Sequence, residues 1–173
     1  MKKGELSKFI RDIADFPKPG IIFKDITPLL KDKAAFKKSI DLMVAHFRKE
    51  KIQQVVSVEA RGFIFGAALA YRLGAGFIPV RKKGKLPYKT TSVTYDLEYG
   101  TDTLEHHEDA FNSGDRVLIV DDVLATGGTV RAVCDLVKKQ KAVIAGLSFL
   151  MELKFLKGRS KLKEFPIYAI LKY

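Results

Sequence analysis

The segment of the chain with the clearest chemistry is a hydrophobic run that leads into two acids and a small, glycine-bearing turn. The run is Val117–Val120, the acids are Asp121 and Asp122, and the turn is Ala125-Thr126-Gly127-Gly128-Thr129. Glycines let the backbone approach a ligand closely, and the free amides at the start of a helix suit a phosphate. Carboxylates accept hydrogen bonds from sugar hydroxyls. The segment therefore predicts a sugar-phosphate site, with acids for the hydroxyls and amides for the phosphate.

The residues around this turn predict the elements that must position it. A continuous run of branched apolar residues is typical of a strand that is buried on both faces of a parallel sheet. After the turn, Val130, Val133 and Val137 follow helical spacing. Strand, turn and helix in this order place the turn at the carboxyl edge of a sheet, where open α/β folds bind ligands. The turn lacks the lysine of a nucleoside-triphosphate P-loop, and there is no G-x-G-x-x-G of a dinucleotide site, so both of those classes are excluded.

The segment from Val117 to Thr129 resembles the phosphoribosyl-pyrophosphate-binding motif of the type I phosphoribosyltransferases. The resemblance extends over nearly the whole chain, through the segments DFPKPGIIFKDITP (15–28), EARGF (59–63), RKKGKLP (81–87) and YDLEYG (95–100). The first and last of these resemble the branch that uses adenine. The resemblance implies transfer of the 5-phosphoribosyl group from phosphoribosyl pyrophosphate to adenine, giving AMP and pyrophosphate. It also implies Mg²⁺ as the cofactor and a homodimer as the assembly.

The same resemblance distributes the phosphate and sugar contacts over several residues. Asp121 and Asp122 are expected to hold the ribose hydroxyls, or the water molecules of Mg²⁺ without a direct bond to the metal. Residues 125–129 are expected to cradle the 5′-phosphate. Arg61, Arg81 and Lys85 are expected to bind the pyrophosphate, Arg61 as a catalytic residue, because arginine offers a fork to phosphate and lysine a point charge. The peptide bond before Ala60 is expected to be cis, as is common in the family.

The base is expected to bind to the segment Ile21-Ile22-Phe23-Lys24. An aromatic residue such as Phe23 can stack on a purine, and backbone groups can read its edge. The resemblance assigns main-chain contacts with adenine to Ile22 and Lys24, and Val123 is expected to pack on the purine. Many relatives have arginine in place of Lys24, a change that main-chain recognition tolerates.

Proton removal from the base is assigned to Glu98. A carboxylate in a closed, dry site can have a raised pKa and accept the proton that adenine loses. Asp96 shares the polar face of the same alternating segment and is the rival candidate. The pair His106-His107 lacks partners with metal-ligand spacing and is expected to be a loop feature.

Size and composition indicate one domain that binds anions. The chain has 173 residues, with 31 Lys and Arg against 20 Asp and Glu, for a net charge of +11. This balance favours an anionic partner, but no aromatic-basic interleaving of the RNA-reading kind is present. No stretch approaches the length of a membrane span, and the single Cys134 excludes an internal disulfide, so a cytoplasmic protein is expected.

The order of the elements predicts an α/β fold with a mostly parallel central sheet flanked by helices. Helices are expected over Leu6–Ile13, Phe36–Phe47 and, buried nearly all round, Gly62–Leu73; strands are expected over 55–58, 77–80, 117–120, 143–150 and 167–171. A small N-terminal hood, roughly 1–34, is expected to cap the ligand. The polar stretch of roughly 84–110, with apolar residues alternating around Val93 and Tyr95, is expected to be a mobile hairpin arm. Relatives often have glycine after the motif helix, where this chain reads Lys139-Gln140-Lys141, so that helix must end without its usual left-handed glycine.

Two other functions remain compatible with the sequence. The nearest is a phosphoribosyltransferase for another base, such as hypoxanthine, xanthine or orotate. The other is a nucleic-acid-binding regulator that keeps this fold and uses the sugar phosphate as an effector. The charge of +11 permits the regulator, but the chain lacks an added helix-turn-helix segment.

Overall fold

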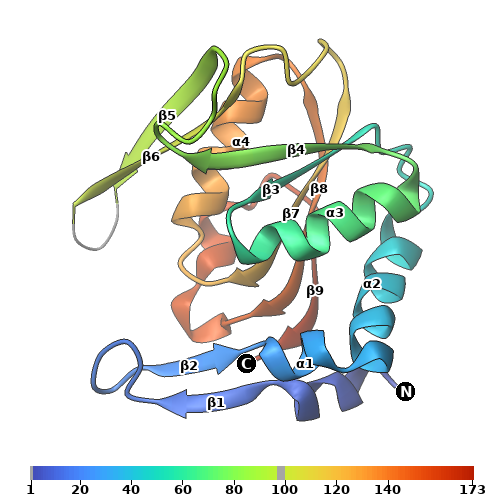
Figure 1. Cartoon of the computed structure of the whole chain (residues 1–173), viewed down its shortest axis with the longest axis vertical. Coiled ribbons are helices and arrows are strands. Elements are labelled where there is room, and N and C mark those ends of the chain that lie inside the picture. Colours follow the sequence, from blue (N-terminus) through green and yellow to red (C-terminus); the bar gives the residue numbers. More distant parts are fainter. Residues whose placement is uncertain (1, 97–99) are drawn as a thin grey trace.

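The central element is a seven-stranded sheet with the strand order β5-β6-β4-β3-β7-β8-β9 (Figure 1). The computed structural model describes residues 2–96 and 100–173. The strands from β4 to β9 in this order run parallel, whereas β5 and β6 form an antiparallel hairpin on the β4 edge. The bounds are β3 Gln54–Val58, β4 Gly76–Lys82, β5 Thr90–Asp96, β6 Thr101–His107, β7 Arg116–Leu124, β8 Val143–Glu152 and β9 Ile167–Lys172. The expected fold class is confirmed.

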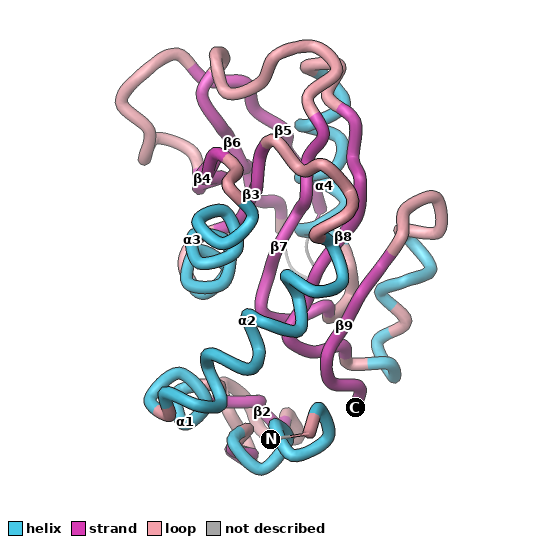
Figure 2. The backbone as a smooth tube through the Cα atoms, turned by 90° about the vertical axis from the view of Figure 1, so that its right-hand side faces the viewer, coloured by secondary structure: helices cyan, strands magenta, loops and turns pink. Residues whose placement is uncertain are grey.

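Helices cover both faces of the sheet (Figure 2). The helices α2 (Lys33–Phe47) and α3 (Arg61–Leu73) pack on the face that carries Leu118 and Val120, while α4 (Gly128–Lys139) packs on the face that carries Ile119. Because successive residues of a strand point to opposite faces, the motif strand β7 contributes to both halves of the core. The predicted helices over 36–47 and 62–73 and the predicted parallel strands are all present.

The strand order reverses direction at β3, which has β4 on one side and β7 on the other. In open α/β sheets, ligands bind at the carboxyl ends of the strands that flank such a switch point. Here the residues that follow β3 begin with Glu59, and the residues that follow β7 form the glycine-bearing turn. The topology therefore brings together two segments that lie far apart in the sequence.

The residues before Asp32 form a separate layer at one end of the molecule (Figure 1). This layer consists of the 3-10 helix η1 (Lys3–Phe9), the antiparallel strands β1 (Arg11–Ala14) and β2 (Ile22–Asp25), and the short helix α1 (Thr27–Lys31). The predicted helix over 6–13 was wrong beyond Phe9, because Ile13 pairs with Phe23 in the small sheet. A helix of that length is marginal by itself, so pairing with β2 determines the local structure.

Two further expectations need correction. The helix α3 is not buried all round: Phe65 and Leu69 are inaccessible, whereas Ile64 and Tyr71 are exposed, Tyr71 by 87%. His106 is not in a loop but near the end of β6, with its side chain buried against the ring of Phe111. Burial of the imidazole lowers the pKa of His106. Strand pairing of β6 with β5 and β4 places this side chain in the core.

The end of α4 shows how the chain manages without the usual glycine. Lys141 has a φ of 60°, so a lysine takes the left-handed conformation in which glycine is favoured. Its carbonyl accepts a hydrogen bond from the N–H of Gly114. Cys134, on the same helix, is fully buried, as expected of a core thiol. Within the described ranges, no helix is long and apolar enough to cross a membrane.

Candidate active site

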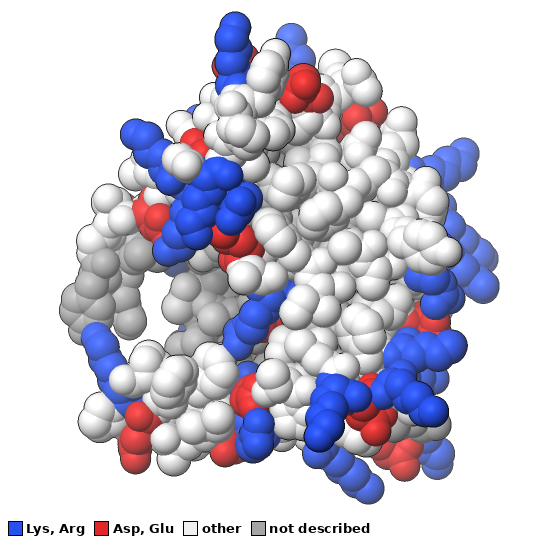
Figure 3. Space-filling view, in the orientation of Figure 1, with Lys and Arg blue, Asp and Glu red and all other residues white. Residues whose placement is uncertain are grey.

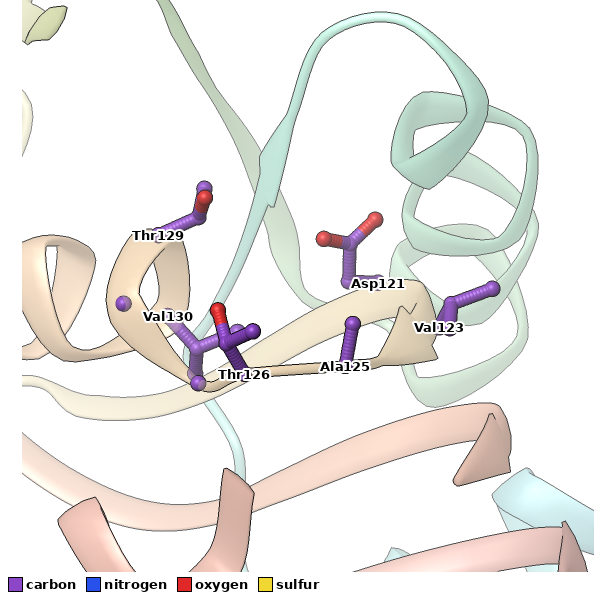
Figure 4. A pocket seen from close by; sticks show the side chains of 8 residues that line it. Asp121, Val123, Ala125, Thr126, Thr129 and Val130 are labelled. Atoms are coloured by element: carbon purple, nitrogen blue, oxygen red, sulfur yellow. The ribbon is translucent and has the colours of Figure 1, made fainter. Parts of the chain in front are cut away.

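The predicted phosphate turn lies between β7 and α4, as the sequence indicates. Gly127 has a φ of 78° and directly precedes α4, which begins at Gly128. A hollow of about 80 Å³ is lined by Asp121, Val123 and the residues from Ala125 to Val130. The polar ends of Asp121, Thr126 and Thr129 lie on the same side of the turn (Figure 4). The hollow therefore combines a carboxylate, hydroxyls and the start of a helix, which suits a phosphorylated sugar.

A second glycine, which the sequence analysis did not select, supports this turn from behind. Gly158 begins the 3-10 helix η3 (Gly158–Lys161), which follows η2 (Lys154–Leu156). A Cβ atom on Gly158 would lie 2.2 Å from the carbonyl oxygen of Ala125, and one on Gly127 would lie 2.6 Å from the carbonyl oxygen of Gly158. The two main chains therefore pack so closely that neither position accepts a side chain. The only sequence signal for this contact is an isolated glycine in a basic segment.

The start of α3 also approaches β7, through Gly62. A Cβ atom on Gly62 would lie 2.8 Å from Oδ1 of Asp121. This approach brings Arg61 to the acid pair, with its Nε 2.7 Å from Oδ2 of Asp122 and its guanidinium 5.0 Å from the ring centroid of Phe23. The contact with Asp122 is an ion pair without a directed hydrogen bond, since no described residue donates one to that buried oxygen. This oxygen is therefore buried against the Arg61 guanidinium, and its charge is compensated by that cation.

The surroundings of Asp121 and Asp122 disfavour the ionised form of both carboxyl groups. Burial raises the pKa of Asp121, and the neighbouring charge of Asp122 raises it further. Burial also raises the pKa of Asp122, although the positive charge of Arg61 opposes that shift. The N–H of Asp122 donates to Oδ1 of Asp121 at 2.9 Å and partly compensates the charge. Adjacent carboxylates of this kind are stabilised when a ligand supplies hydroxyl donors or a cation.

The base site forms beside the phosphate hollow. A cavity of about 350 Å³ is lined by residues from β2, from the start of α3, from β7 and its turn, and by Leu153: Ile21, Ile22, Phe23, Lys24, Arg61, Asp121, Asp122, Val123, Ala125 and Leu153. It shares Asp121, Val123 and Ala125 with the hollow for the phosphate. The predicted sugar and base residues are therefore brought together, and Leu153 is an addition that the sequence did not indicate.

The side chain of Lys24 is engaged elsewhere. Its Nζ lies 2.7 Å from Oδ1 of Asp12 and 4.4 Å from the ring centroid of Tyr173. The side chain thus fastens β2 to β1 and to the carboxyl end of the chain. Recognition of the base through the main chain of Lys24 stays a prediction.

A larger apolar chamber of about 550 Å³ lies next to the base cavity and shares Ile21, Ile22, Lys24 and Leu153 with it. Its other walls come from Gly20, Thr126, Phe155, Leu156 and Tyr173. The chamber lies between the N-terminal layer and the segment after β8. The base cavity is therefore open on an apolar side that the sequence did not predict.

The remaining cations collect on one carboxylate that the sequence analysis did not assign to the site. Oε2 of Glu59 lies 3.0 Å from Nη2 of Arg81 and 3.3 Å from Nζ of Lys85. The N–H of Lys82 donates to Oε1 of Glu59 at 2.8 Å. The peptide bond between Glu59 and Ala60 is cis, as predicted. Arg81 and Lys85 do not line the sugar or base cavities; Glu59 links them to the segment that leads to Arg61.

The hairpin arm touches the phosphate turn through its first strand. The hydroxyl of Tyr95 lies 3.3 Å from Oγ1 of Thr129, and Val93 and Tyr95 face the core while Thr94 and Asp96 are exposed. The predicted alternation is confirmed for these residues. Glu98, the expected proton acceptor, lies outside the described residues.

The surface around the site is unevenly charged. Figure 3 shows Lys and Arg side chains interspersed with acids on the side of the molecule near the β4–β6 edge. The area over α3 in the same view is largely without charge. Within the described ranges, no cluster of His, Cys, Asp and Glu side chains has the arrangement of a direct metal site.

Comparisons with known proteins agree with this geometry. The family model described as the phosphoribosyl transferase domain matches residues 25–167. Proteins called adenine phosphoribosyltransferase are 59% identical in Syntrophotalea carbinolica and 56% identical in Brachyspira hyodysenteriae, each over 98% of this chain and 99% of the relative.

Solved structures of adenine phosphoribosyltransferases superpose closely. The enzyme from Thermoanaerobacter pseudethanolicus has a TM-score of 0.96 and 52% identity, over 99% of this chain and 100% of the other. The enzyme from Saccharomyces cerevisiae, in a complex with an imino-altritol bisphosphate and adenine, has a TM-score of 0.94 and 42% identity, over 98% of each chain. The chain belongs to the phosphoribosyltransferase family and, within it, to the adenine phosphoribosyltransferases.

The buried acid pair predicts a gain in stability when its charge is removed. Because the folded-state pKa of Asp121 is raised above 3.8, the native state binds more protons than the unfolded state, and the acid costs stability as the pH rises through the folded-state pKa. We expect Asp121→Asn to raise the free energy of unfolding at neutral pH, because the amide removes a charge that desolvation and the neighbouring Asp122 destabilise. The gain should disappear as the pH falls toward 3.8. Urea unfolding at several pH values measures this gain in stability. Asp96→Asn, which changes an exposed acid, is the control. A gain that does not depend on pH would show that the charge of Asp121 is not its cause.

The close packing behind the turn predicts a specific loss of phosphate affinity. We expect Gly158→Ala to displace the turn, because the new methyl group would meet the carbonyl oxygen of Ala125. Affinity for ribose 5-phosphate should fall roughly tenfold or more, as overpacking costs about 1–3 kcal/mol. Isothermal titration measures the effect. Gly4→Ala is the matched control, since a Cβ atom there meets nothing within 4 Å; equal affinities of the two variants would refute the role of Gly158.

Proposed function

We propose that this chain transfers the 5-phosphoribosyl group from phosphoribosyl pyrophosphate to adenine, giving AMP and pyrophosphate. The observation that carries the proposal is the shared wall between the hollow at the phosphate turn and the base cavity, formed by Asp121, Val123 and Ala125. A ribose that spans this wall has its 5′-phosphate at the turn and its anomeric carbon toward Phe23. The relatives named for this reaction, and the yeast enzyme in complex with adenine, support it.

The cations provide the charge stabilisation that the reaction needs. Cleavage of the bond between ribose C1 and pyrophosphate leaves positive charge on the sugar ring and negative charge on the leaving group. Arg61, Arg81 and Lys85 are suited to stabilise the departing pyrophosphate, and Asp121 and Asp122 orient the ribose through its hydroxyls. Bound Mg²⁺ would neutralise the pyrophosphate further, and the carboxylate of Asp121, which lines both cavities, would hold one of its water molecules.

Proton removal from adenine is assigned to Glu98, and the arm that carries it is proposed to close over the site. Closure would exclude the water that otherwise hydrolyses the activated sugar. The contact between Tyr95 and Thr129 supports this proposal, because it ties the arm to the turn that holds the phosphate.

The remaining features of the enzyme follow the same proposal. The N-terminal layer, roughly residues 1–34, would act as a hood because β2 supplies a wall of the base cavity. A homodimer is supported by the largely uncharged area over α3 (Figure 3) in a chain of net charge +11. Ile64 and Tyr71 of this helix are exposed apolar and aromatic side chains. The cytoplasmic location stays a prediction.

The reaction is tested by incubating the protein with labelled adenine, phosphoribosyl pyrophosphate and Mg²⁺. We expect labelled AMP and stoichiometric pyrophosphate, with hypoxanthine, xanthine and orotate as far poorer acceptors. Efficient use of one of these bases would replace adenine in the proposal. Absence of any transfer, together with RNA or DNA binding that changes with phosphoribosyl pyrophosphate, would favour the regulator instead.

The role of Glu98 predicts a loss confined to turnover. Glu98→Gln removes the proton acceptor but keeps the size of the side chain, so kcat should fall about 100-fold, within the range of general acid–base catalysis. The affinity for phosphoribosyl pyrophosphate should change little. Steady-state kinetics and isothermal titration measure the two quantities, and Asp96→Asn is the matched control. If Asp96→Asn loses the turnover and Glu98→Gln keeps it, the proton acceptor is Asp96.

A further inference from the structure

Glu59 occupies an unexpected place among the cations of the pyrophosphate site. Its Oε2 is 3.0 Å from Arg81 and 3.3 Å from Lys85, and both cations therefore share one carboxylate oxygen. The Glu59 side chain is only 11% exposed, whereas those of Arg81 and Lys85 are 35% and 49% exposed. The carboxylate thus lies beneath the two cations, whose outer sides remain open to a ligand.

The carboxylate is charged under ordinary conditions. Burial alone would raise the pKa of Glu59, but the hydrogen bonds from the N–H of Lys82 and from the side chains of Arg81 and Lys85 outweigh burial and lower it. A pyrophosphate bound to the same two cations meets this negative charge directly behind them. Like charges that share partners at such short range compete for them.

The segment that carries the cations, from Arg81 near the end of β4 to Lys85, has other anchors besides the bond from the N–H of Lys82 to Glu59. The guanidinium of Arg81 also donates to the carbonyl oxygen of Lys85 at 3.2 Å. The N–H of Gly84 donates to the buried carboxylate of Glu105 at 2.9 Å, and the N–H of Lys83 donates to the carbonyl oxygen of Thr103 at 3.1 Å. Strand β6 therefore also holds this segment.

We propose that Glu59 is a positioning residue that holds Arg81 and Lys85 in the ligand-free enzyme and competes with pyrophosphate for them. The competition weakens the binding of pyrophosphate and so favours its release as a product. This inference rests on the proposed function, in which both cations bind pyrophosphate. It assigns to Glu59 the tuning of affinity, distinct from any contact with the substrate.

The test is isothermal titration of inorganic pyrophosphate, with Mg²⁺, into the parent protein and its variants. Glu59→Gln keeps an acceptor for the N–H of Lys82 but removes the charge, so it should bind pyrophosphate roughly tenfold more tightly, as expected for loss of one close like charge in a partly exposed site. Asp102→Asn is the matched control. This variant removes an equal charge from the same neighbourhood, but Asp102 pairs with Lys82, at 3.0 Å, and not with Arg81 or Lys85. The affinity of Asp102→Asn for pyrophosphate should therefore stay close to that of the parent.

A second variant and a kinetic measurement keep the outcomes separate. Glu59→Asp retracts the carboxylate by one methylene group and should give an affinity between those of the parent and Glu59→Gln. Inhibition of the forward reaction by pyrophosphate should strengthen in the same order. A parent that does not bind pyrophosphate would refute the proposed function. If the parent binds pyrophosphate but Glu59→Gln and Glu59→Asp bind it equally or more weakly, the proposed role of Glu59 is wrong, while the proposed function stands.

Discussion

The site depends on the close approach of main chains that only glycine permits. At the phosphate turn, Gly127 and Gly158 bring β7, α4 and η3 together without an intervening side chain. At the neighbouring helix, Gly62 allows the start of α3 to lie against the carboxylate of Asp121. A methyl group at Gly127 or Gly158 would push the turn and η3 apart, and one at Gly62 would displace the carboxylate of Asp121. The cavities for sugar and base exist because these backbones converge at the switch point of the sheet.

The electrostatics of the ligand-free protein are organised for a ligand that is both polyhydroxylated and anionic. Asp122 is buried at the end of β7 and Asp121 is half-buried beside it, and both have raised pKa values, which is unfavourable until hydroxyl donors arrive. The cations near β4 are instead neutralised in advance by Glu59. One half of the site therefore gains stabilisation when the ligand binds, while the other half must exchange one anion for another. Functional sites commonly contain charges that are unfavourable without a ligand, because such charges affect both the affinity for the substrate and the release of the product.

The hairpin of β5 and β6 connects these two halves. Its first strand reaches the phosphate turn through Tyr95 and Thr129, and its second strand holds the cation loop through Glu105 and Gly84. The hairpin therefore contacts both the turn before α4 and the segment that carries Arg81 and Lys85. In the proposed function, closure of this arm would act on both at once.

The sequence by itself determined the strand, turn and helix around Asp121 to Thr129, the parallel α/β class and most of the base segment, because these patterns are local and each is read within about one turn or strand. It also predicted that Arg61, Arg81 and Lys85 bind an anion, which stays a prediction. The tertiary structure alone decided that Glu59 joins two of those cations, that Gly158 lies behind the turn, and that Leu153 lines the base cavity. It also showed that Ile13, predicted to be helical, lies in a strand, and that His106, predicted to be in a loop, lies in the core. The physical reason is the same in each case: these contacts join residues that are distant along the chain, and only the pairing of the strands brings them within reach.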